Sequence, residues 1–101
     1  MMKYKKKIFY VENTSTEKII KQFSTPLYCY SYIKLRNNIL DFKKNFKEIN
    51  PLVCFSVKSN SNINLLREIK KFNCGADVVS KGEMMLAFKA GINNNKIVFQ
   101  E

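Results

Sequence analysis

The chain has 101 residues, of which 46% are hydrophobic and 13% aromatic, and its formal net charge at pH 7 is +10. This length allows one domain or part of one, and the hydrophobic fraction excludes a wholly disordered chain. No apolar run in the sequence approaches the roughly 20 residues that a membrane-spanning helix needs, and the apolar run after the basic N-terminus is too short for a signal peptide. We therefore expect a cytoplasmic protein that has no membrane partner.

The positive charge raises the question of nucleic-acid binding, but its composition argues against that partner. Of the 18 basic residues only Arg36 and Arg67 are arginine, the residue that leads base recognition, and the lysines are spread along the whole chain. The sequence has no histidine, and its three cysteines show no CxxC spacing, so we expect no metal site. Cys29 and Cys54 lie in strand-like runs and are expected to be buried.

The first part of the chain predicts a short lead-in. Residues 4–11 alternate weakly between apolar and polar types, which indicates one strand. Thr14 and Glu17 have the spacing of a capping box, with Thr14 as the N-cap of a short helix that ends before Pro26. Residues 27–30 then predict a strand.

Alternating helices and strands are predicted for the rest of the chain. A helix capped by Ser31 carries one apolar stripe and ends at Asn50 and Pro51. The stripe consists of Leu35, Ile39, Phe42, Phe46 and Ile49. The predicted elements that follow are a strand at 52–57 and a helix from Ser61 or Asn62 to about Asn73, with Gly75 as its C-cap or as a turn. A strand at 76–80, a helix at 82–90 stopped by Gly91, and a strand at 97–99 complete the prediction.

The order β-α-β-α-β-α-β from residue 27 onward predicts an α/β fold with a parallel sheet. The two candidate architectures are a doubly wound sheet and part of a (β/α)8 barrel. No GxGxxG or GxxxxGK[ST] phosphate loop follows any strand, which weakens the nucleotide-binding version. We expect an incomplete TIM-type barrel, with only its N-terminal strands and helices. In this interpretation residues 1–24 are a lead-in strand and helix, and residues 25–101 are βα units.

Functional groups in parallel α/β folds gather at the carboxyl ends of the strands. This rule selects Lys58, Ser80 and the pair Gln100-Glu101, with Asp77 inside a strand and Glu83 at the start of the next helix. A lysine near two carboxylates suits a Schiff-base site. Each residue also has a structural interpretation: Lys58 as a strand exit, Asp77 as a strand-end hydrogen bond, and Glu83 as a charge favoured by the helix dipole.

Four segments in order carry a family resemblance: TPLYCY at 25–30, CFSVKSNSN at 54–62, CGADVVSKGE at 74–83 and KIVF at 96–99. Together they resemble the N-terminal part of the diaminopimelate decarboxylases, which belong to the alanine-racemase-like, fold type III pyridoxal-phosphate decarboxylases. The resemblance covers nearly the whole chain. Ser56 and Ser59 replace the alanines usual in the family, which are small-for-small changes.

The resemblance implies that Lys58 is the catalytic lysine that bonds covalently to pyridoxal 5′-phosphate, and that Asp77 and Glu83 bind the cofactor beside it. It also implies decarboxylation of meso-2,6-diaminopimelate to L-lysine, an amino-acid substrate and a homodimer. The family's ring-stacking histidine, glycine-rich phosphate loop and C-terminal β domain have no counterpart in this chain, so we expect an incomplete piece that is inactive alone.

Two alternatives remain open. One keeps the cofactor and changes the reaction to an ornithine, arginine or carboxynorspermidine decarboxylase, or to a racemase. The other is a non-catalytic α/β binding module that uses its basic surface.

Overall fold

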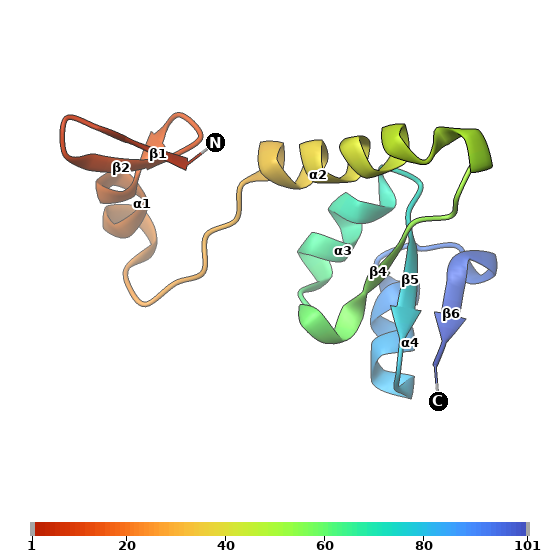
Figure 1. The fold of residues 1–101 in the computed structure, drawn as a ribbon. Coiled ribbons are helices and arrows are strands. Elements are labelled where there is room, and N and C mark those ends of the chain that lie inside the picture. Colours follow the sequence, from red (N-terminus) through yellow and green to blue (C-terminus); the bar gives the residue numbers. More distant parts are fainter. Residues whose placement is uncertain (1, 101) are drawn as a thin grey trace. The chain divides into compact units, whose positions relative to one another are not determined.

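The structure, a computed structural model, describes residues 2–100 (Figure 1). The chain divides into two compact units, residues 2–42 and residues 43–100, and each is described by itself. Within residues 2–100, every helix falls short of the length and apolar character that a membrane-spanning helix requires.

The first unit begins with an antiparallel hairpin of β1 (Met2–Lys5) and β2 (Ile8–Val11), and β3 (Thr14–Ser15) pairs with β2 on its other side. The prediction of one strand over residues 4–11 is therefore wrong. Lys6 and Lys7, with φ of 51° and 69°, form the two-residue turn. Left-handed residues at both turn positions match the twist of a hairpin, and a weak alternation pattern does not reveal such a turn between lysines.

Helix α1 (Thr16–Phe23) follows β3 directly. Its N-cap is Ser15, whose hydroxyl oxygen accepts a hydrogen bond from the Lys18 backbone N–H at 3.2 Å. The predicted cap, Thr14, instead pairs with Val11 in the small sheet. The helix therefore starts one residue later than the capping-box spacing indicates, because strand pairing takes Thr14.

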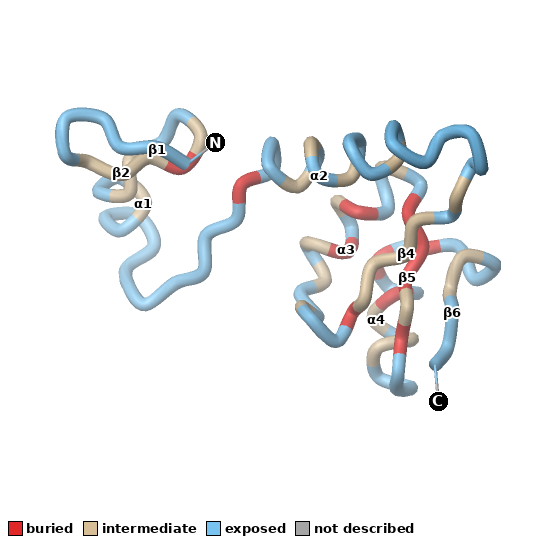
Figure 2. The backbone as a smooth tube through the Cα atoms, in the orientation of Figure 1, coloured by how far each residue is buried: buried red, intermediate tan, exposed pale blue. Residues whose placement is uncertain are grey.

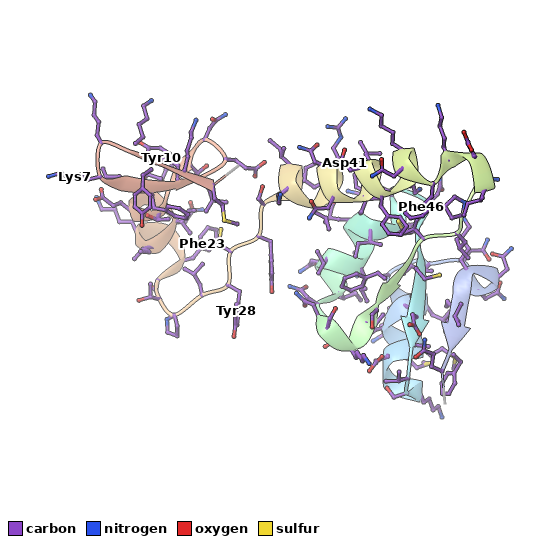
Figure 3. The ribbon with its side chains drawn as sticks, in the orientation of Figure 1. Lys7, Tyr10, Phe23, Tyr28, Asp41 and Phe46 are labelled. Atoms are coloured by element: carbon purple, nitrogen blue, oxygen red, sulfur yellow. The ribbon has the colours of Figure 1, made fainter. Side chains whose placement is uncertain are left out.

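The strand predicted at residues 27–30 does not form. Residues 24–30 are exposed throughout and connect α1 to the next helix (Figure 2). The Tyr28 side chain, 91% exposed, extends away from this segment (Figure 3). A strand needs backbone partners on a neighbouring strand, and none of the strands in residues 2–100 pairs with this segment. For the same reason Cys29 is exposed, contrary to the expected burial.

Helix α2 (Tyr32–Asn45) begins as predicted, since the Ser31 hydroxyl oxygen accepts from the Lys34 backbone N–H at 3.1 Å. Its end differs from the prediction. The α-helix stops at Asn45, and a 3-10 turn, η1 (Lys47–Ile49), leads to Asn50 at φ 47°. Ile49, the last residue of the predicted stripe, is consequently 72% exposed.

The second unit is a parallel sheet of β4 (Cys54–Ser56), β5 (Gly75–Val78) and β6 (Ile97–Phe99) in the order β4-β5-β6. Helix α3 (Ile63–Lys70) connects the first two strands, and α4 (Lys81–Lys89) with the turn η3 (Asn94–Lys96) connects the last two. The last strand and the Asn62 cap of α3 agree with the sequence prediction. The other two strands are shorter than predicted. β4 ends at Ser56 because the turn η2 (Val57–Ser59) begins at Val57, and β5 ends at Val78, before Ser80 caps α4.

Both connecting helices pack on one face of this sheet. Val57, Ala76 and Val78 from the strands and turn form one buried cluster with Leu66 of α3 and Ala87 of α4. Strands that follow one another in space and in sequence, with their helices on the same side, are the arrangement of a (β/α)8 barrel. The expected fold class, the N-terminal part of a TIM-type barrel, is confirmed.

Gly75 is required by close packing inside β5. A Cβ atom at this position would lie 2.1 Å from the Lys96 carbonyl oxygen and 2.9 Å from Cys54 Sγ. The prediction that Gly75 caps α3 is wrong. Asn73, at φ 59°, supplies the left-handed residue after the helix, a conformation that asparagine adopts more readily than most residues.

Candidate functional site

Lys58 lies in η2, immediately beyond the carboxyl end of β4. The residue before it, Val57, is 0% exposed and anchors the turn in the core, whereas Lys58 itself is exposed. The Ser59 hydroxyl donates to the Ser56 carbonyl oxygen at 2.7 Å, and the Asn60 N–H donates to the Val57 carbonyl oxygen at 3.0 Å. The turn is therefore built by local hydrogen bonds that present one amine at this edge of the sheet.

Asp77 projects from the central strand, β5, on the face opposite the helices. It is in register with Ser56 of β4 and Val98 of β6. Because strand side chains alternate, Asp77 lies on the other side of the sheet from its neighbours Ala76 and Val78, which face the core. In a complete barrel, this is the face that points inward.

The two oxygens of Asp77 differ in their surroundings. Oδ2 accepts a hydrogen bond from Gln100 Nε2 at 2.9 Å, and the Gln100 backbone N–H donates to the Val78 carbonyl oxygen at 2.9 Å. Oδ1 is buried and has no hydrogen-bond partner among residues 2–100. A buried acceptor without a partner is costly unless a donor or cation reaches it. The Gln100 contact also gives Asp77 the strand-end hydrogen bond of its structural interpretation.

The charge of Asp77 affects a neighbouring thiol on the same face. Burial raises the pKa of the Cys54 thiol, and the negative charge of Asp77 raises it further. Cys54 is partly buried, so the expected burial is only partly met, and its thiol is not activated for nucleophilic chemistry.

Glu83 lies in the first turn of α4 and helps to build the start of that helix. The Ser80 hydroxyl oxygen accepts from the Glu83 N–H at 3.1 Å, and Glu83 Oε1 accepts from the Val79 N–H at 3.1 Å. This reciprocal pair is a variant of the capping box. Ser80 is thus a helix cap rather than a free hydroxyl.

The sequence rule of carboxyl strand ends therefore found Lys58, Asp77, Ser80 and Gln100, and the structure places all of them at that edge of the second unit. It did not find the Gln100–Asp77 hydrogen bond, which joins positions 23 residues apart. Glu101 lies outside the described residues. Within residues 2–100, no three His, Cys, Asp or Glu side chains cluster as metal ligands would.

A parallel sheet with sequential strands, helices on one face and an exposed lysine at the carboxyl edge defines the class of α/β-barrel proteins whose chemistry resides at that edge. Residues 33–101 match the family described as pyridoxal-dependent decarboxylase, pyridoxal binding domain. The chain belongs to the pyridoxal-dependent decarboxylase family, and the matched region is its pyridoxal binding domain.

Individual relatives agree with this assignment. The chain is 40% identical over 83 residues to a diaminopimelate decarboxylase of Helicobacter pylori, covering 82% of this chain and 20% of that protein. It is 38% identical over 96 residues to one of Haemophilus influenzae, covering 95% and 23% respectively. The chain thus spans about a fifth of the length of the curated relatives it matches.

Solved structures show the same similarity. The crystal structure of AQ1208 from Aquifex aeolicus matches with a TM-score of 0.92 and 35% identity, over 97% of this chain and 24% of that one. A diaminopimelate decarboxylase from M. jannaschii, in complex with L-lysine, matches with a TM-score of 0.91 and 30% identity, over 98% and 24%.

Proposed function

We propose that this chain supplies the lysine-bearing part of a pyridoxal-phosphate enzyme that decarboxylates meso-2,6-diaminopimelate to L-lysine and CO2. The observation that carries the proposal is the exposed Lys58 at the carboxyl edge of β4. The neighbouring strand holds a buried carboxylate oxygen that has no hydrogen-bond partner among residues 2–100. The substrate rests on the relatives, which are diaminopimelate decarboxylases.

The residues at this edge fit a pyridoxal cofactor. Lys58 offers a primary amine, the group that can bond to the aldehyde of pyridoxal phosphate. Asp77 Oδ1 offers a buried acceptor for a cationic or proton-donating group. When bound, the cofactor supplies an electron sink for the electron pair left when CO2 departs. Lys58 and Asp77 would hold it, with Glu83 as the second carboxylate of the site.

The chain's own residues have separable roles in this proposal. Lys58 would hold the cofactor and, as a free amine, would accept or donate a proton at its Nζ. Gln100 fixes one oxygen of Asp77, so the carboxylate keeps one orientation while Oδ1 stays available. Glu83 Oε1 is engaged with the Val79 N–H, so its contribution includes holding the segment between β5 and α4 in place.

The cofactor part of the proposal is tested by trapping. The 101-residue chain is incubated with pyridoxal phosphate, reduced with borohydride and mapped by peptide mass spectrometry. We expect the adduct to concentrate on Lys58, to disappear in Lys58→Ala, and to persist in Lys81→Ala, which removes another exposed lysine that follows a strand end. An adduct spread evenly over the surface lysines would contradict the proposal.

The reaction is tested in a chimera. Residues 2–100 replace the matching segment of the Haemophilus influenzae relative, which aligns with 95% of this chain. We expect release of CO2 from meso-diaminopimelate, and a loss of at least about a thousandfold in kcat in the Lys58→Ala chimera, because the covalent amine is removed. A Lys58→Ala chimera as active as its parent would overturn the assignment of Lys58, and turnover of ornithine or arginine in preference to diaminopimelate would overturn the substrate.

A homodimer and a cytoplasmic location belong to the same proposal. The homodimer rests on the resemblance to the family, and the location rests on the short apolar runs of the sequence. Sedimentation of the chimera at several concentrations tests the first, and fractionation of cells that express it tests the second. For the binding-module alternative, the matched measurement is salt-sensitive binding of DNA or RNA by the 101-residue chain, which we do not expect at physiological salt.

A further inference from the structure

A pocket lies at the amino edge of the parallel sheet, away from Lys58. It has a volume of about 210 Å³. Its lining residues are Lys70, Asn73, Cys74, Gly91, Asn93 and Lys96. A single water needs only roughly 10–15 Å³, so the pocket has room for a polyatomic ligand.

The topology brings these residues together from two connections, the one from α3 to β5 and the one from α4 to β6. Helix α3 ends at Lys70, α4 ends just before Gly91, and Lys96 directly precedes β6. In Figure 1, the end of α3 and the start of β5 lie at the end of the sheet opposite the tips of the strand arrows. The candidate active site and this pocket therefore use opposite edges of the same three strands.

The lining carries positive charge and hydrogen-bond donors. Lys70 and Lys96 contribute two ammonium groups, and among residues 2–100 no carboxylate lines the pocket. Asn93 also lines the pocket, where its Oδ1 accepts from the Asn95 N–H at 3.2 Å and its side-chain amide nitrogen is a hydrogen-bond donor by type.

A third ammonium group lies nearby. Lys43 Nζ donates to the Phe72 carbonyl oxygen, one residue before the pocket wall. Burial raises the pKa of the Cys74 thiol, but Lys43 and Lys96 both act to lower it, which places their charges within electrostatic reach of this buried wall.

Gly91 lies beside Lys70 in the lining of the pocket. Its φ is +90°, a conformation that favours glycine, and a Cβ atom there would lie 3.5 Å from Cε and 3.6 Å from Nζ of Lys70. The Lys70 side chain is exposed, and its ammonium group lies close to Gly91 at the pocket.

Lysines at helix ends also have a simpler role, because they compensate the negative ends of helix dipoles. Comparing the charge of the helix ends with that of the lysines decides between dipole compensation and ligand binding. Each helix C-terminus contributes about half a negative charge, so α3, α4 and α2, whose last turn carries Lys43, together contribute roughly one and a half. Three ammonium groups exceed that by about one and a half positive charges, which the dipoles leave uncompensated.

We propose that this pocket is a binding site for a small multivalent oxyanion, with inorganic phosphate as its simplest ligand. The site is separate from the cofactor chemistry at Lys58 and does not depend on the proposed decarboxylation. Oxyanions accept from lysine ammonium and amide N–H groups, which are the donors that the pocket presents.

The test is a phosphate titration of the ¹⁵N-labelled 101-residue chain at constant ionic strength. We expect saturable amide shifts at Asn73, Gly91, Asn93 and Lys96, and none of comparable size at Lys58 to Asn60. Sulfate should compete and acetate should not, because the pocket favours a multivalent oxyanion. A separate trapping experiment on Lys58 reports the cofactor site, so failure of one proposal leaves the other measurable.

Variants complete the test. Lys70→Gln and Lys96→Gln should each weaken phosphate binding about threefold, and the double variant about tenfold, because one ammonium contact is removed at a time. The matched control Lys89→Gln removes an exposed lysine outside the pocket and should leave the affinity unchanged. Shifts that are linear in phosphate, or an equal loss in the control, would overturn the site and indicate general attraction to a basic chain.

Discussion

The two units differ in how they are held together. Val11 is the one buried hydrophobic residue that the described part of the first unit has, whereas the second unit has nine of the ten in residues 2–100. The first unit relies on a hairpin and local caps, and the second on a sheet whose helices share one core. Both sites proposed above lie in the second unit. The two proposals therefore place their chemistry on the unit whose strands and helices share a core.

The largest expected effect comes from the shared core. Leu66 is 0% exposed and packs in the cluster of the second unit. We expect Leu66→Ala to lower the free energy of unfolding by about 3 kcal/mol, measured by urea denaturation. The matched change in the first unit, Ile20→Ala at a site 46% exposed, should cost well under half of that. Equal losses of unfolding free energy in the two variants would show that the core of the first unit contributes as much to stability as that of the second.

A second effect tests close packing within the sheet. Gly75→Ala would place a Cβ atom 2.1 Å from the Lys96 carbonyl oxygen, so we expect a loss of about 1–3 kcal/mol as β5 and β6 are forced apart. Gly82 has only Ser80 Oγ near its Cβ position, at 3.9 Å, and lies in α4. Gly82→Ala should therefore stabilise the chain by about 0.5 kcal/mol. Thermal melts of the two variants should shift in opposite directions.

A third effect concerns the start of α4. Ser80→Ala removes the N-cap acceptor for the Glu83 N–H and should lower the free energy of unfolding by about 1 kcal/mol. Ser61→Ala is the matched control, because Asn62 rather than Ser61 caps α3. Circular dichroism during urea unfolding measures both variants, and an equal response would contradict the assignment of Ser80 as a cap.

The smallest effect distinguishes the thiols of the two units. Cys29 is exposed, whereas the pKa values of Cys54 and Cys74 are raised, chiefly by burial. Iodoacetamide reacts with accessible thiolates, so at pH 8 we expect it to modify Cys29 roughly tenfold faster than Cys54 and Cys74. Mass spectrometry at successive times measures the three rates. Similar rates at all three would show that the second unit opens freely.

The same pKa shifts predict that the stability of the folded chain decreases at alkaline pH. Because folding raises the pKa of Cys54 and Cys74, their contribution to stability is fully present below the thiol pKa of the unfolded chain, 9.0, and is lost as pH rises through the higher folded values. Unfolding measured from pH 8 upward should show this decline, and Cys54→Ser should reduce its slope.

The sequence by itself determined the elements whose signals are local. The last strand, the Ser31 and Asn62 caps, the stop at Gly91 and the position of Lys58 after a strand follow from hydrophobic spacing and turn chemistry within a few residues. The four family segments carried the resemblance, which the match of residues 33–101 to the family confirms.

Only the tertiary structure decided the features that depend on partners distant in the sequence. The strand predicted at residues 27–30 has no described partner to pair with, and Gly75 is required by a carbonyl 21 positions away rather than by a helix end. The hydrogen bond from Gln100 to Asp77 likewise joins separate βα units, and so do the lysines around the pocket at the amino edge of the sheet. Spacing along a chain specifies local geometry, but contacts between strands and helices arise only when the sheet forms.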